Sequence, residues 1–116
     1  MNKKILVVDD EPLVLEAIDR ALSKAGYEVK TVRDGNSCLE ALSLQSFGLI
    51  IMDLHIPGSS TMELAEHAKA KCPEAKFLFI SGGHAPSDAV HYIQKPFRIN
   101  DMRQLVGSIL GNAAQN

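Results

Sequence analysis

The sequence is poor in cysteine and aromatic residues and has no tryptophan and no long apolar run. Its two cysteines, Cys38 and Cys72, have neither CxxC spacing nor a histidine cluster near them, which argues against a disulfide framework or a zinc site. No apolar run is long enough to span a membrane, and the four apolar residues before Asp9 are too few for a signal peptide. We therefore expect a cytoplasmic protein with two buried free thiols.

An excess of positive charge is also absent. Twelve Lys and Arg residues face fourteen Asp and Glu residues, and the net charge is only −2. Direct binding to nucleic acid, or to a membrane through a polybasic patch, is therefore not expected. The 116 residues fit a single domain, 1–116. We expect its core over about 3–111, followed by a frayed C-terminal tail.

Short apolar runs alternate along the chain with segments of helical periodicity. The runs predict strands over 5–8, 27–32, 49–53, 76–80 and 90–94, with helices over 12–25, 36–45, 60–72 and 99–110 between and after them. Such alternation with short loops predicts an α/β fold with a parallel sheet covered by helices on both faces. In the first helix the expected buried stripe is Leu13, Val14, Ala17, Ile18, Ala21, Leu22 and Ala25.

Polar residues follow four of the five predicted strands. They are Asp9 and Asp10, Asp53, Ser81 and Lys95. Taken singly, Asp10 could cap the first helix and Asp53 could turn the chain before Pro57. Together, however, they meet at one edge of a parallel sheet, where ligands bind in such folds. Clustered carboxylates need a cation, and their hard oxygen atoms suit Mg²⁺.

Four motifs give the chain a resemblance to a known family. They are VVDDE at 7–11, MDLHIPG at 52–58, FISG at 79–82 and YIQKPF at 92–97. With this spacing, the chain resembles over nearly its whole length the receiver domain of bacterial two-component response regulators. The resemblance implies a flavodoxin-like, doubly wound five-stranded sheet of order 2-1-3-4-5. It also implies a signalling module rather than an enzyme.

The resemblance assigns roles to particular residues. Asp53 would be the phosphoacceptor, taking a phosphoryl group from a sensor histidine kinase or a phosphotransfer protein. Lys95 and Ser81 would contact that group, and Tyr92 would be the switch aromatic that responds to Ser81. The ligands of Mg²⁺ would be Asp9, Asp10, Asp53 and the backbone carbonyl of His55.

The chain departs from the family between Ser81 and Lys95, where the spacing is about two helical turns short. We therefore expect 82–89 to cross without a regular helix, so that the fourth helix of the family is shortened or absent. The fourth and fifth strands would then expose an apolar patch drawn from Phe77, Phe79, Val90 and Tyr92, open to a homodimer or a partner helix.

Three alternative functions remain open at this point. The first is a docking module that works without phosphorylation, and the second is the receiver of a hybrid histidine kinase. The third is a Mg²⁺-dependent aspartyl phosphatase of the haloacid-dehalogenase type, which uses a DxD motif that Asp53, Leu54 and His55 do not form. The cognate kinase and the downstream output do not follow from the sequence.

Overall fold

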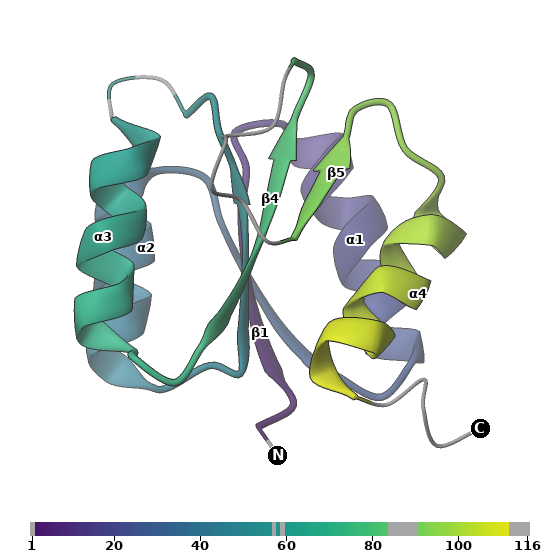
Figure 1. The fold of residues 1–116 in the computed structure, drawn as a ribbon, viewed down its shortest axis with the longest axis horizontal. Coiled ribbons are helices and arrows are strands. Elements are labelled where there is room, and N and C mark those ends of the chain that lie inside the picture. The colour runs from purple at the N-terminus through teal and green to yellow at the C-terminus, as the bar shows by residue number, and fades with distance from the viewer. Residues whose placement is uncertain (1, 57, 59, 84–90, 112–116) are drawn as a thin grey trace.

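The computed structural model describes residues 2–56, 58, 60–83 and 91–111. Five parallel strands form one sheet in the order β2-β1-β3-β4-β5, as expected. In Figure 1, α1 and α4 cover one face of this sheet and α2 and α3 cover the other. The strands are β1 (Lys4–Val8), β2 (Glu28–Val32), β3 (Leu49–Asp53), β4 (Lys76–Ser81) and β5 (Tyr92–Gln94), and the helices are α1 (Pro12–Lys24), α2 (Gly35–Leu44), α3 (Thr61–Lys71) and α4 (Ile99–Leu110).

Local sequence signals set the helix ends. Pro12 is the first residue of α1, where its missing N–H costs nothing. The side chain of Asp34 accepts a hydrogen bond from the Ser37 N–H at 2.7 Å and begins α2. Ser60 is the N-cap of α3, and Gly111 ends α4 in the left-handed conformation that glycine adopts without strain. Glu11 is the N-cap of α1, so Asp10 does not cap that helix.

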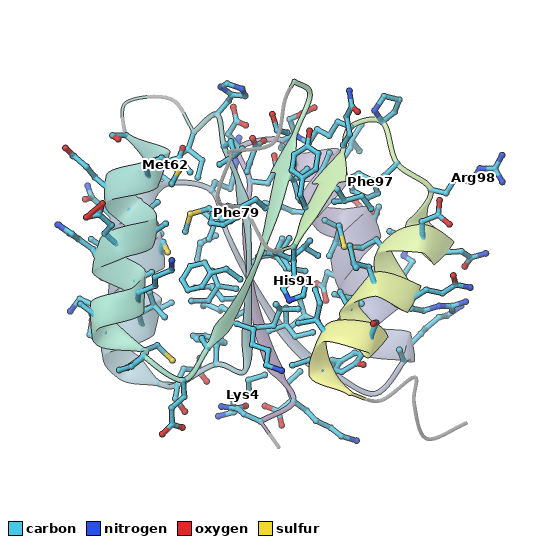
Figure 2. The ribbon with its side chains drawn as sticks, viewed as in Figure 1. Lys4, Met62, Phe79, His91, Phe97 and Arg98 are labelled. Atoms are coloured by element: carbon cyan, nitrogen blue, oxygen red, sulfur yellow. The ribbon has the colours of Figure 1, made fainter. Side chains whose placement is uncertain are left out.

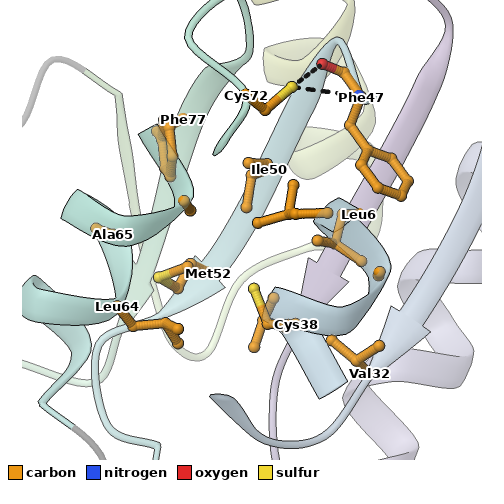
Figure 3. Packing of buried hydrophobic residues seen from close by; sticks show 14 of the residues in the cluster. Leu6, Val32, Cys38, Phe47, Ile50, Met52, Leu64, Ala65, Cys72 and Phe77 are labelled. Carbon is orange, nitrogen blue, oxygen red and sulfur yellow. Dashed lines mark hydrogen bonds between the residues drawn. The ribbon is translucent and has the colours of Figure 1, made fainter. Parts of the chain in front are cut away.

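Alternation along the strands divides the apolar core into two clusters. Leu6, Ile50 and Met52 point to the face covered by α2 and α3. Ile5, Val7 and Ile51 point to the face covered by α1 and α4. Figure 3 shows the first cluster, in which the thiol of Cys72 bonds to the backbone of Phe47 and Cys38 packs below Leu6. Both cysteines are free and buried, as expected.

Several expected elements begin or end one or two residues from their predicted bounds. Tyr27 precedes β2 because its N–H bonds to the Leu22 carbonyl at the end of α1. Within the described residues, the strand expected over 90–94 is β5 from Tyr92 to Gln94, and the His91 carbonyl before it accepts the Phe79 N–H of β4. Helix α1 ends at Lys24, and Ala25 is its C-cap. The strand and helix order is otherwise as predicted.

The expected apolar patch on β4 is wrong for both phenylalanines. Phe77 and Phe79 stack on each other and are buried in the cluster beneath α3, and Figure 2 shows Phe79 on that side of the sheet. The pleat turns both rings toward α3, because residues two apart in a strand share a face. Tyr92 is half-buried. Val90, and most of the 82–89 segment expected to cross without a helix, lie outside the described residues.

Candidate functional site

The predicted acids, Ser81 and Lys95 lie at the carboxyl ends of β1, β3, β4 and β5, the edge marked by the arrowheads in Figure 1. Each is positioned where strand pairing stops. Asp9 follows β1 and donates its N–H to the Val32 carbonyl at 3.2 Å. Asp53 ends β3 opposite Ile80, and the Lys95 N–H bonds to the Ser81 carbonyl at 2.8 Å. Residues distant in sequence therefore meet at one edge.

Four acidic residues at this edge form a cluster. One carboxylate oxygen from each of Asp9, Asp10, Glu11 and Asp53 lies within 4.8 Å of the others. Asp9 is fully buried and Asp53 nearly so, whereas Glu11 is exposed. Such a cluster is unfavourable unless positive charge balances it.

Lys95 supplies positive charge to the cluster. Its Nζ atom lies 2.9 Å from Asp53 Oδ2, 3.0 Å from Asp9 Oδ2 and 2.5 Å from Glu11 Oε1. The contacts to Asp53 and Glu11 are hydrogen bonds. Lys95 precedes Pro96 across a cis peptide bond, as the family resemblance implies.

The pKa values of Asp9 and Lys95 reflect this packing. Burial raises the pKa of the Asp9 carboxyl, although the hydrogen bond from the Glu11 backbone and the nearby ammonium group of Lys95 act in the opposite direction. Burial alone would lower the pKa of Lys95, but Glu11, Asp53 and Asp9 together raise it above its usual range. Lys95 is therefore a permanent cation at neutral pH.

The remaining oxygen atoms of the two buried aspartates accept backbone hydrogen bonds. Asp9 Oδ1 accepts from the Glu11 N–H at 2.9 Å, and Asp53 Oδ1 accepts from the His55 N–H at 2.8 Å. Asp9 Oδ2, in contrast, is buried and has no partner with hydrogen-bond geometry despite its proximity to Lys95. A buried carboxylate oxygen with spare acceptor capacity beside three other acids fits a hard divalent cation such as Mg²⁺.

Ser81 and Tyr92 are joined through Gly83 rather than directly. The hydroxyl of Ser81, which is buried, accepts the Gly83 N–H at 3.0 Å, and the hydroxyl of Tyr92 donates to the Gly83 carbonyl. The Ser81 hydroxyl makes no hydrogen bond to Asp53 or Lys95 among the interactions of the described residues. Tyr92 is the first residue of β5 and pairs with Phe79, so the predicted switch pair lies on neighbouring strands and is linked through Gly83.

A groove of about 530 Å³ adjoins the acidic cluster between α1 and the start of α4. Glu11 and Lys95 line one part of it, and Leu13 and Phe97 line another. The sequence offered one signal for Glu11, which is its place directly after two aspartates. Its contact with Lys95 was missed because the two residues are 84 positions apart.

Comparisons with known proteins agree with this geometry. The family model for the response regulator receiver domain matches residues 5–107. The response regulator receiver protein CpdR of Brucella abortus (strain 2308) is 33% identical over 109 residues, which cover 86% of this chain and 90% of CpdR. The chain spans about half the length of three transcriptional regulatory proteins that it also matches, from 45% to 49%.

Solved structures give the same result. The response regulator TrrA from Thermotoga maritima, in complex with Mg²⁺-BeF, is 31% identical with a TM-score of 0.81, covering 94% of this chain and 99% of that chain. A CheY-like receiver domain from Methanospirillum hungatei JF-1 is 25% identical with a TM-score of 0.87, covering 99% and 98%. No helix among the described residues is long and apolar enough to cross a membrane. By sequence and by fold, the chain belongs to the receiver domain family of two-component response regulators.

Proposed function

We propose that this chain takes up a phosphoryl group on the carboxylate of Asp53 from the phosphohistidine of a sensor histidine kinase or a phosphotransfer protein. The observation that carries the proposal is the ammonium group of Lys95, held 2.9 Å from Asp53 Oδ2 at a buried strand end. In the transfer, an Asp53 oxygen attacks phosphorus and the phosphorus–nitrogen bond breaks, leaving its electron pair on the imidazole. Lys95 offsets the negative charge of the incoming group.

Mg²⁺ is the cofactor we propose for this site. The residues that would hold it are Asp9, Asp10 and Asp53, with the backbone carbonyl of His55. When bound, the cation neutralises charge on the transferring group and orients it for in-line attack. The complex of the similar TrrA with Mg²⁺-BeF supports this assignment.

Ser81 and Tyr92 would transmit the structural change that phosphorylation of Asp53 causes. A phosphoryl group beside Ser81 gives its hydroxyl a new acceptor, and a movement of Ser81 would reach Tyr92 through the Gly83 hydrogen bonds.

Because Phe77 and Phe79 are buried, the apolar patch that would have favoured a homodimer or a partner helix on this face loses its main members. We therefore do not propose a homodimer or a partner helix on this face.

Intact-mass measurement with acetyl phosphate and Mg²⁺ tests the proposal. We expect one phosphoryl group on the wild type, none without Mg²⁺ and none on Asp53→Asn. The matched control is Asp101→Asn, which changes an exposed aspartate in the first turn of α4 and should be labelled like the wild type. Equal labelling of Asp53→Asn would disprove the assignment, and an unlabelled wild type would favour a phosphorylation-independent docking module.

A further inference from the structure

The side chain of Glu11 forms an ion pair with Lys95 and does not cap its own helix. Glu11 is the N-cap of α1, yet its side chain makes no capping hydrogen bond. Its carboxylate lies 2.5 Å from Lys95 Nζ, and the Glu11 side chain is 58% exposed. The exposed Glu11 is therefore an outer partner of a lysine whose other partners are buried.

Lys95 is already surrounded by anions before any phosphoryl group arrives. An ammonium group has three donors, and three carboxylates contact the one on Lys95. Phosphorylation of Asp53 would bring further anionic oxygens to the same ammonium group. The Asp53 carboxylate itself becomes an acyl phosphate and loses its charge. The phosphoryl oxygens would then compete for Lys95 with the two carboxylates that remain, those of Asp9 and Glu11.

The two remaining carboxylates differ in what their release would cost. The side chain of Asp9 is 0% exposed, so losing Lys95 would leave it as a buried charge without that cation. Glu11 would instead return to water, because an exposed ion pair contributes little to stability. Release of Glu11 is thus the less costly.

We infer that Glu11 is the exchangeable partner of Lys95, holding the ammonium group in the resting protein and giving it up to the phosphoryl group. This inference rests on the proposed function. Glu11 is then a positioning residue that acts through Lys95. It competes with the phosphorylated form, so removing its charge should favour that form.

Binding of beryllofluoride, a phosphoryl mimic, in the presence of Mg²⁺ measures this competition. We expect Glu11→Gln to bind beryllofluoride about two- to fivefold more tightly than the wild type, the range that an exposed ion pair supports. The matched control is Glu16→Gln. Glu16 lies in α1, is 62% exposed and pairs with Arg20 on the solvent side of the helix, so this variant should bind like the wild type.

A second readout needs no bound ligand. In the free protein, NMR should show a shifted Lys95 side-chain ammonium signal in Glu11→Gln but not in Glu16→Gln. The signal reports the contact between Glu11 and Lys95 in the resting protein, and a purely structural role of Glu11 would change this signal without tightening beryllofluoride binding. Equal or weaker beryllofluoride binding by Glu11→Gln overturns the exchange, whereas a wild type that binds no beryllofluoride overturns the proposed function itself.

Discussion

Lys95 is the residue that makes the acidic edge compatible with folding. Asp9 and Asp53 are buried within 4.8 Å of each other and of two further acids. Two buried charges of the same sign destabilise the native state, because the unfolded chain separates and hydrates them. Lys95 interacts with both, and Glu11, Asp53 and Asp9 together raise the pKa of this lysine despite its partial burial.

Replacing Lys95 by Met should therefore destabilise the metal-free protein at pH 7, by about 2–4 kcal/mol. This loss in the free energy of unfolding should become smaller as the pH falls toward 5. Burial raises the pKa of Asp9 in the folded state, so the native protein binds a proton at a higher pH than the unfolded chain does. That protonation removes the uncompensated charge and restores stability. Urea unfolding at both pH values measures the difference.

The control for this variant is Lys76→Met. Lys76 is the first residue of β4, at the end of the sheet opposite the acidic cluster. It donates a hydrogen bond to the Ile109 carbonyl at 3.0 Å. Its replacement should give a loss that does not depend on pH between 5 and 7. An equal loss for Lys95→Met at both pH values would show that the lysine does not offset buried acidic charge.

At the scale of elements, apolar periodicity predicts where helix α1 lies, and packing decides which of its side chains are buried. The spacing of apolar residues places the helix, but Leu13, Ala17 and Ala25 of the expected stripe are exposed. Leu15, which lies outside that stripe, is buried with Ile18 and Leu22. Helical spacing defines a stripe, whereas packing against the sheet and α4 decides which flank of it is covered. Leu13 lines the groove beside Lys95 instead.

Two leucines of α1 give a matched pair for testing this packing. Leu15→Ala should cost about 2–4 kcal/mol, since it leaves a cavity against the sheet. Leu13→Ala removes the same atoms from a residue that is 79% exposed, and its effect should stay within about 0.5 kcal/mol. Chemical unfolding of both variants provides the comparison. Similar losses would mean that α1 is rotated relative to the structure described above.

The strand-end residues were predictable for a reason that does not hold for Glu11. Asp9, Asp53, Ser81 and Lys95 each follow an apolar run, and parallel pairing brings the ends of such runs to one edge. The contact between Glu11 and Lys95 depends on side-chain reach across two loops, which no local pattern records. Burial of Phe77 and Phe79 was missed because it depends on the pleat of β4 and on how closely α3 packs.

At the scale of the whole molecule, binding of Mg²⁺ should be linked to folding. Only the folded chain gathers Asp9, Asp10 and Asp53. A ligand that binds only the native state raises stability by about 2.7 kcal/mol at a hundredfold excess over its dissociation constant. Thermal melts should therefore show a higher melting temperature with Mg²⁺ than with a monovalent salt of equal ionic strength. Asp9→Asn should reduce the increase, and an unchanged wild-type melting temperature at millimolar Mg²⁺ would contradict a cation site here.

The end of the sheet opposite the acidic cluster is a suitable place to attach a label. The acids, Ser81 and Lys95 lie at the carboxyl ends of the strands, whereas the turn before β4, with its exposed Glu74, lies at the other end. Close backbone packing limits part of that end, since a Cβ atom at Gly48 would lie 2.1 Å from the Asn2 carbonyl oxygen. Glu74 has no such restriction. A fluorophore or a surface tether attached there would leave the acidic edge facing solution, accessible to the kinase or phosphotransfer protein that we propose as its partner.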